Sequence, residues 1–260
     1  MTDRPDTRLF VEDRLAAGTR IVLGRGQTHY LANVLRLGPG AVVALFNGRH
    51  GEWQARIESL RKGGGIVAVE TLCREQHREP DLWLVFAPVK RVPLAFIVQK
   101  ATELGVSELI PVVTRRTVVG RIKRERMEAT AIEAAEQSER LTVPRVRDAE
   151  PMMRVFDAWP TGRPLLLCAE SGPAEPIQDA LRQLETDTPG AILIGPEGGF
   201  EETELDALRK LPFVTAVGLG PRILRADTAA LAALACWQSA LGDWRLKPDG
   251  RMHETANGRD

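Results

Sequence analysis

Two segments of the sequence place glycine, proline and charged residues directly after short apolar runs. The first is Gly195-Pro-Glu-Gly-Gly199, which follows the run 191–194, and the second is LGPRILRADT (219–228), which follows TAVG (215–218). Open α/β sheets bind ligands at the carboxyl ends of their strands, and glycine lets backbone amides approach a ligand closely. Either segment alone could be an ordinary strand-to-helix turn, but the pair predicts one ligand site built from two loops.

Several common kinds of catalytic site are excluded by the distribution of residues. The four histidines are His29, His50, His77 and His253. None lies between residues 78 and 252, so a Ser-His-Asp or Cys-His site cannot form within that stretch. The P-loop pattern is absent, and GLGPRI has only two of the three glycines of a dinucleotide fingerprint. Glycine-rich strand ends with a few carboxylates and arginines suit a cofactor that carries its own leaving group.

The cysteines give no sign of a metal or a disulfide framework. Cys73, Cys168 and Cys236 form no C-x-x-C pair, and no His, Cys or carboxylate cluster has metal-ligand spacing. Cys168 and Cys236 fall within apolar segments, and we expect them to be inert core thiols. The sequence therefore predicts a protein without a metal.

The elements around the two loops divide the chain into two modules. Up to residue 73, short segments broken by turns predict a small β-rich module with a helix at 28–37, and Asn47-Gly48 predicts a hairpin. Beyond it, unbroken apolar runs alternate with helical patterns, which predicts an α/β domain with a mainly parallel sheet. These runs cover residues 82–89, 108–113, 164–169, 191–194 and 213–219. The expected divisions are a domain at 1–73, a linker at 74–80, a domain at 81–246 and a disordered tail at 247–260.

Three helices of the second domain have readable limits. The apolar spacing from Leu94 to Leu104 predicts a helix that Gly105 caps at its carboxyl end. Thr203 with Asp206 resembles a capping box at the start of another. The helix expected at 228–241 is apolar nearly all round, so it must be buried, and a second copy of the chain is one candidate partner.

The net charge of zero conceals two basic stretches. Residues 1–73 hold ten basic against seven acidic residues, and residues 114–147 hold nine against five. A solvated helix face would explain this bias, and so would a surface that contacts phosphates. No apolar run approaches the roughly 18–20 residues that cross a bilayer, and MTDRPDTRLF lacks the apolar core of a signal peptide. A cytoplasmic protein with no membrane partner is the simplest expectation.

From Arg8 to about Gly242, the sequence resembles one known family. IGPEGGF (194–200) and LGPRILRADTAALAAL (219–234) resemble the paired loops of the SPOUT class of S-adenosylmethionine-dependent RNA methyltransferases. HYLANVLRLGPG (29–40), IVQKATELGV (97–106) and AAEQSERLTVPRV (134–146) narrow the resemblance to the RsmE family of 16S rRNA (uracil-N3) methyltransferases. The resemblance implies methylation of N3 of a uridine in 16S rRNA, uridine 1498 of the decoding region.

The resemblance also implies the fold and the partners. The second domain would be a SPOUT domain with a deep trefoil knot, a rare exception to unknotted topology, and the first a PUA-like β-barrel that binds RNA. The protein would be a homodimer that binds S-adenosylmethionine and acts on 16S rRNA or the small ribosomal subunit. The cofactor would contact Ile194, Gly195, Pro196, Gly199, Leu219, Gly220, Ile223, Leu224 and Thr228, and side chains at Gly195 or Gly199 would intrude on it.

Roles for charged residues remain open at this stage. Glu197 is a candidate base, or it interacts with a helix dipole; Arg225 is a candidate catalytic residue, or it forms an ion pair with Asp227 or Glu197. Glu136, Gln137 and Arg140 either line the RNA side or belong to an exposed helix face. The residues expected to contact RNA are Arg8, Arg25, Arg36, Arg115, Arg116, Arg121 and Lys123. Ribose 2′-O-methylation and RNA binding without catalysis are the alternative functions.

Overall fold

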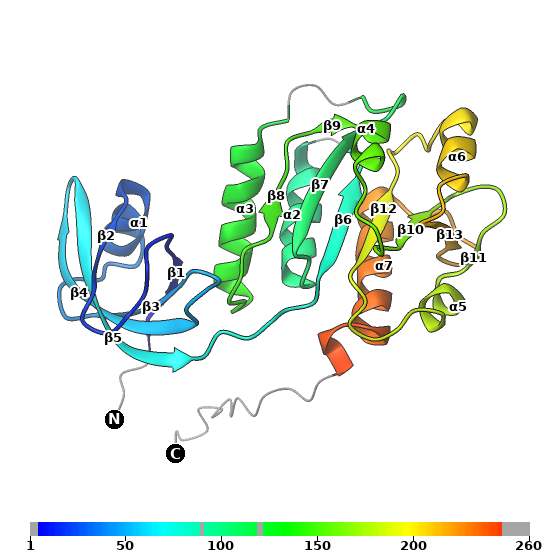
Figure 1. Ribbon diagram of the computed structural model, residues 1–260. Helices are drawn as coiled ribbons and strands as arrows, with labels where there is room; N and C mark the ends of the chain where they lie inside the picture. The colour runs from blue at the N-terminus through cyan, green and yellow to red at the C-terminus, as the bar shows by residue number, and fades with distance from the viewer. Residues whose placement is uncertain (1–4, 89–90, 119–121, 246–260) are drawn as a thin grey trace, which may run out of the picture.

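The computed structural model describes residues 5–88, 91–118 and 122–245. Two β-sheets organise these residues, one near the amino terminus and a larger one that follows it (Figure 1). The tail expected to be disordered, 247–260, lies outside the described residues. None of the helices in the described ranges combines the length and the apolar character that a membrane span requires.

The first sheet has five strands in the order β1-β3-β4-β5-β2. Their bounds are β1 (Arg8–Phe10), β2 (Arg20–Leu23), β3 (Val42–Phe46), β4 (Glu52–Arg61) and β5 (Gly64–Arg74). Only β1 and β3 are parallel among these neighbours. The sheet encloses a core that includes Leu9, Leu31, Leu45 and Val67, all at most 2% exposed.

The hairpin predicted at Asn47-Gly48 is confirmed between β3 and β4, where Phe46 pairs with Glu52. The Asn47 side chain accepts hydrogen bonds from the backbone N–H groups of Arg49 and His50, and Gly48 has a φ of 75°. The predicted helix exists, but it begins earlier and ends differently. It consists of α1 (Arg25–His29) and a π-helical turn (Tyr30–Val34), a form that is frequent at functional sites.

The second sheet has its main path in the order β11-β13-β10-β12-β6-β7-β8, and β9 pairs with β7. All of its pairings are parallel, as the unbroken apolar runs predicted. The long strands are β6 (Leu82–Phe86), β7 (Glu108–Val113), β10 (Leu165–Cys168), β12 (Gly190–Ile194) and β13 (Val214–Gly218). Short ones are β8 (Arg145–Val146), β9 (Glu150–Pro151) and β11 (Glu175–Pro176).

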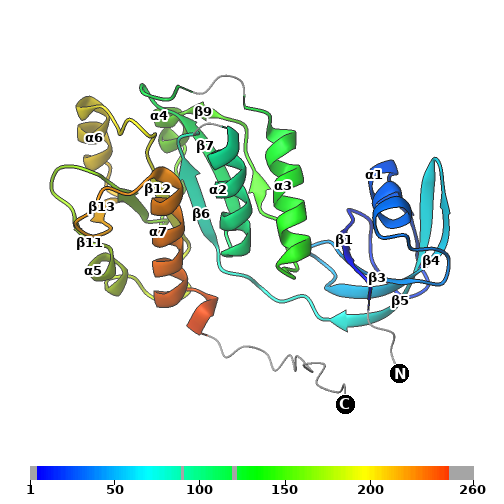
Figure 2. The ribbon, with the colours of Figure 1, turned by 180° about the vertical axis from the view of Figure 1, so that it is seen from behind.

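Helices cover both faces of this sheet (Figures 1 and 2). One face packs against α2 (Arg91–Glu103), α3 (Arg124–Gln137), α5 (Ile177–Arg182) and α7 (Ala226–Ala240). The other face packs against α4 (Met152–Asp157) and α6 (Glu202–Arg209). A short 3-10 helix, Asp243–Arg245, follows α7. Both central strands, β6 and β12, are therefore buried on two sides.

Two helix limits differ in detail from their sequence signals. Gly105 caps α2 as expected, with a φ of 82° and its N–H donating to the carbonyl of Thr102. The prediction of a capping box formed by Thr203 and Asp206 was wrong. Glu201 is the N-cap of α6, and the Glu204 side chain accepts a hydrogen bond from the Glu201 N–H at 3.0 Å. The helix starts earlier because a carboxylate, like a hydroxyl, can accept the free backbone N–H groups of its first turn.

Helix α7 is buried along one face rather than all round. Ala230, Ala233, Leu234 and Trp237 are at most 2% exposed, whereas Leu231 and Ala232 are half-buried. Trp237 packs so closely on the start of β12 that a Cβ at Gly190 would lie 1.9 Å from its ring. This contact fixes α7 against the strand from which the first glycine-rich loop emerges. Strand β5 runs to Arg74 and residues 75–80 form no helix or strand, but the domain boundaries themselves stay a prediction.

Candidate active site

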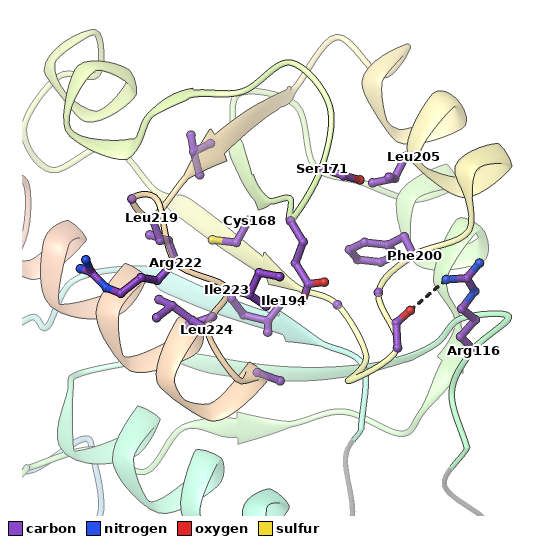
Figure 3. A pocket seen from close by; sticks show the side chains of 18 of the residues that line it. Arg116, Cys168, Ser171, Ile194, Phe200, Leu205, Leu219, Arg222, Ile223 and Leu224 are labelled. Atoms are coloured by element: carbon purple, nitrogen blue, oxygen red, sulfur yellow. Dashed lines mark hydrogen bonds between the residues drawn. The ribbon is translucent and has the colours of Figure 1, made fainter.

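The two glycine-rich loops converge on a single cavity of about 420 Å³ (Figure 3). The first loop leaves the carboxyl end of β12, and the second leaves the carboxyl end of β13. Strand β10 lies between these strands in the sheet, and its own carboxyl end contributes Cys168 and the following Glu170. Three parallel strand ends therefore form the site at the edge where such sheets bind ligands.

Most residues predicted to hold a cofactor line this cavity. They are Ile194, Gly195, Gly199, Leu219, Gly220, Ile223 and Leu224. Pro196 and Thr228 do not. Pro196 is buried within the turn, and Thr228 is exposed on the first turn of α7, where its N–H donates to Asp227 Oδ1 at 2.7 Å.

The protein itself constrains these glycines, apart from any bound cofactor. A Cβ at Gly195 would lie 2.7 Å from the ring of Phe200, so a side chain there would first collide with the cavity wall. Gly199 and Gly220 have φ values of 68° and 98°, which L-residues rarely adopt. A Cβ at Gly220 would meet no atom within 4 Å, so its constraint is purely conformational.

Two charged side chains of the wall were not assigned to it from the sequence. Arg116, expected to contact RNA, also lines the cavity, and its Nη1 donates a hydrogen bond of 2.9 Å to the carbonyl of Gly198. Glu170 follows β10 and carried no motif. The only signal for Glu170 was its place directly after the apolar run 164–169, at the edge where the loops meet.

Cys168 is a half-buried thiol at the wall of the cavity rather than a fully enclosed core residue. Burial, with a smaller effect of the neighbouring Cys236, raises the pKa of the Cys168 thiol to about 12. The group is therefore a neutral thiol at physiological pH, which agrees with the inert character expected from the sequence. Within the described part of the chain, no three His, Cys, Asp or Glu side chains are grouped as metal ligands would be.

A second hollow of about 420 Å³ adjoins the first and contains both predicted catalytic residues. Glu197 and Arg225 line it, together with Glu170, Ile223, Leu224 and Ala226. Four of these six residues also line the first cavity, and Glu170 is the only one of the four that can ionise. Arg225 is the exposed N-cap residue of α7, and it forms no ion pair with another described residue.

The remaining predicted RNA contacts are distributed unevenly. Arg25, Arg36 and Lys123 are exposed, and Arg36 has a φ of 58°. Arg115 is exposed and lies 3.5 Å from Glu201. Arg121 lies outside the described residues.

The prediction that Arg8 contacts RNA was wrong, because its side chain is turned into the protein. Its side chain is only 11% exposed, and it donates hydrogen bonds to Glu52 and to the end of α3. Arg140 was also wrong as an RNA-facing or exposed residue, because it is 9% exposed and bonded to Glu79. Glu136 accepts a hydrogen bond from the Phe10 N–H, whereas Gln137 is exposed. The sequence could not reveal these contacts because their partners are far away in the chain.

Comparison with known proteins places this chain among the RNA methyltransferases. Residues 77–238 match the family described as RNA methyltransferase domain, and residues 14–70 match the RNA methyltransferase PUA domain. A ribosomal RNA small subunit methyltransferase E of Rickettsia conorii is 32% identical over 88% of this chain and 93% of its own. The protein of that name from Bacillus subtilis is 31% identical, over 80% of this chain and 86% of its own. The chain belongs to the ribosomal RNA small subunit methyltransferase E family.

Solved structures agree with this assignment. A ribosomal RNA small subunit methyltransferase E of Neisseria gonorrhoeae, bound to S-adenosylmethionine, has a TM-score of 0.81 and 28% identity, covering 92% of this chain and 99% of its own. A Legionella pneumophila protein solved with bound S-adenosylmethionine has a TM-score of 0.79 and 28% identity, covering 93% and 100%. The expected fold class, a SPOUT domain with a trefoil knot beside a PUA-like β-barrel, is confirmed.

Proposed function

We propose that this enzyme methylates N3 of a uridine in 16S rRNA, and that the target is uridine 1498 of the decoding region. The chain is an S-adenosylmethionine-dependent rRNA methyltransferase by family. The observation that carries the proposal is the convergence of two glycine-rich loops, some 25 residues apart in the sequence, on one cavity with an adjoining hollow. A donor and an acceptor can meet where two such spaces share a wall.

The residues of the cavity fit S-adenosylmethionine chemically. Ile194, Leu219 and Leu224 offer apolar surface for an adenine ring, and the loops around them offer backbone groups for its nitrogens and for ribose hydroxyls. The guanidinium of Arg116 suits the carboxylate of the methionine part. Bound there, the cofactor supplies an electrophilic methyl group.

The protein must hold the uracil in line and remove one proton. N3 of neutral uracil carries a proton, which leaves at or before methyl transfer. A positioned base contributes about 10²–10⁴-fold in rate, whereas alignment of two reactants contributes roughly 7–11 kcal/mol. Alignment is therefore the larger effect, and it suits a site that contains no histidine.

Three side chains around the second hollow have proposed roles. Glu170 borders both spaces and is assigned as the acceptor of the N3 proton. Glu197 borders only the outer space and is assigned to orient the base. Arg225 is assigned to stabilise the negative charge that develops on the uracil, since no described carboxylate neutralises it.

The partners follow from the surface. N3 is hidden within a base pair, so the target is a single-stranded or distorted element of the rRNA or of the small ribosomal subunit. Arg25, Arg36, Arg115 and Lys123 form the proposed RNA-contacting surface, together with Arg116 at the cavity wall. Ile223 is 86% exposed beside the cavity, and a second subunit would cover it in the proposed homodimer. The proposed compartment is the cytoplasm, where the rRNA is found.

Nucleoside analysis of rRNA from a strain that lacks the gene tests the proposal. Loss of 3-methyluridine from 16S rRNA, restored by the intact gene, is the expected result. Loss of a 2′-O-methyl nucleoside instead would assign the enzyme to ribose methylation, with Arg225 as the leading residue. An unchanged nucleoside profile would contradict both activities and leave RNA binding without catalysis.

A further inference from the structure

A buried network of charges joins the β-module to the carboxyl end of α3. Arg8, on β1, donates from Nη1 to the carbonyls of Ala135 and Glu136 at 2.8 and 2.9 Å, and from Nη2 to the carbonyl of Arg140 at 2.7 Å. The last carbonyls of a helix have no partner within the helix and carry partial negative charge. Arg8 therefore caps a helix that belongs to the other module.

The capping side chain is itself held in place from within the β-module. Arg8 Nε lies 2.5 Å from Glu52 Oε2, and Arg74 contacts the same carboxylate at 2.8 Å. Arg74 also donates to the carbonyl of Glu139, just beyond α3. The side chains of Arg8 and Glu52 are only 11% and 12% exposed. We call Arg8, Glu52 and Arg74 the α3 clamp.

The far side of the clamped segment is anchored in the parallel-sheet domain. Arg140 is 9% exposed and donates to the carbonyls of Thr102, in the last turn of α2, and Val106, between α2 and β7. Its guanidinium also pairs with Glu79 of the segment between the modules. The backbone of Arg140 thus accepts from the β-module while its side chain is fixed to the other domain.

This contact determines orientation as well as attachment. Neighbouring domains within a chain usually move relative to one another unless their interface is large and apolar. Here a planar guanidinium with directed donors meets carbonyls in fixed positions, so the geometry allows little rotation. All three guanidinium nitrogens of Arg8 and both carboxylate oxygens of Glu52 have a hydrogen-bond partner, as a buried ionic contact requires.

Helix α3 transmits this orientation to the active site. Its 14 residues span about 21 Å. It begins beside the exposed Lys123, after the segment that carries Arg116, and it ends at the clamp (Figure 1). The exposed cations of the β-module, Arg25 and Arg36, are therefore held at a set separation from the cavity.

We propose that the α3 clamp is a positioning device that makes the β-module and the cavity bind one continuous RNA. This inference rests on the proposed RNA-contacting surface. Two sites held at a fixed distance gain affinity for a ligand that reaches both, because the second contact becomes intramolecular. Arg8 is then a positioning residue that never touches the substrate, and its effect depends on the length of the RNA.

The test compares two fragments of 16S rRNA that contain the target uridine. One is long enough to reach from the cavity to the β-module, and the other is too short. For Arg8→Ala, the affinity for the long fragment should fall by about tenfold or more. The affinities for the short fragment and for S-adenosylmethionine, the latter measured by calorimetry, should not change. Arg8→Lys keeps the charge without the planar guanidinium, so its affinity for the long fragment should lie between those of the wild-type protein and Arg8→Ala. It replaces the alanine variant if that variant fails to fold.

Arg20→Ala is the matched control. It removes the same charge from the same module, but Arg20 forms an exposed ion pair with Glu58 and takes no part in the clamp. It should keep the preference for the long fragment. The inference is overturned if the Arg8 variants lower the affinity for both fragments equally or for neither of them. It is also overturned if the wild-type protein does not bind the long fragment more tightly than the short one. Methylation by the wild-type protein is measured separately, so failure of the clamp and failure of the proposed function are distinguishable.

Discussion

The Nη1 group of Arg116 donates a hydrogen bond of 2.9 Å to the carbonyl oxygen of Gly198. Through this bond the basic segment after β7 is tied to the glycine-rich turn after β12, although the two residues are 82 positions apart. A side chain that was expected to contact RNA therefore also forms part of the cavity wall. The neighbouring Arg115 points elsewhere and lies 3.5 Å from Glu201.

Substitution of these two arginines should separate cofactor binding from RNA binding. Arg116→Ala should raise the Kd for S-adenosylmethionine by roughly fivefold, since an exposed hydrogen bond contributes about 1 kcal/mol. Arg115→Ala should leave that Kd unchanged, because its side chain does not line the cavity. Both should weaken RNA binding and flatten its salt dependence by up to about 0.7 in log–log slope. Calorimetry and RNA titrations across a salt series give both quantities, and equal cofactor affinities in the two variants would contradict the assignment.

Gly195→Ala should deform the cavity. The added methyl group would lie 2.7 Å from the Phe200 ring, so the ring or the turn must move, which costs about 1–3 kcal/mol in a packed site. The unfolding temperature should fall, and the Kd for the cofactor should rise. Gly63→Ala is the control, because no atom lies within 4 Å of its Cβ and its φ is not positive. An unchanged cofactor Kd in Gly195→Ala would show that Phe200 relaxes freely.

The two carboxylates near the uracil site should differ in importance. Glu170→Gln should lower kcat by about 10²-fold or more while changing the cofactor Kd less than twofold, because a glutamine cannot accept the N3 proton. Activity should recover partly as the pH rises towards the ionisation of N3 itself. Glu197→Gln should cost less than about tenfold. If Glu170→Gln instead weakened cofactor binding and left kcat intact, Glu170 would be a cofactor ligand.

The α3 clamp should make stability depend on pH. Burial alone would raise the pKa of Glu52, but hydrogen bonds from Arg74 and Arg8 and their charges outweigh it, so the pKa lies below its usual value. Glu139 and Cys73 are the other titratable groups nearby. Because the folded pKa is lowered, the stabilisation is complete above the unfolded value of about 4.3 and is lost as the pH falls through the folded one.

Denaturant unfolding at several pH values measures this effect. Wild-type protein should be more stable than Glu52→Gln at neutral pH, and the difference should shrink as the pH falls below about 4.3. Glu58→Gln is the control, since Glu58 pairs with the exposed Arg20 and takes no part in the α3 clamp. A difference between wild type and Glu52→Gln that stays constant with pH would show that the carboxylate charge contributes nothing.

Local patterns were enough to predict the parallel sheet and the two loops. Strands such as β6 and β12 are buried on both faces, so their apolar runs are uninterrupted and visible in the sequence. The loops were visible because glycine and proline are restricted to particular backbone geometries. The resemblance to a known family added the cofactor and the knot, which no periodicity encodes.

Features that depend on distant partners could not be predicted. Strand β1 has three residues and exists only because it pairs with β3. Arg8 looked like a surface cation because its partners follow 44 to 132 positions later. Glu170 had no motif, since its significance comes from two loops that fold around it. These are long-range contacts, and a sequence pattern records mainly local ones.

The position of each loop on the sheet has a consequence for how the site responds to its ligand. The 195–199 turn follows β12, which has a strand on each side and helices on both faces. The 219–225 loop follows β13, and the strand on the outer side of β13, β11, has only two residues. Amide hydrogens of the 195–199 turn should exchange slowly even without cofactor, and those of the 219–225 loop should exchange quickly. Cofactor binding should therefore slow exchange chiefly at residues 219–225. We therefore expect the 195–199 turn to change little on cofactor binding and the 219–225 loop to become more protected.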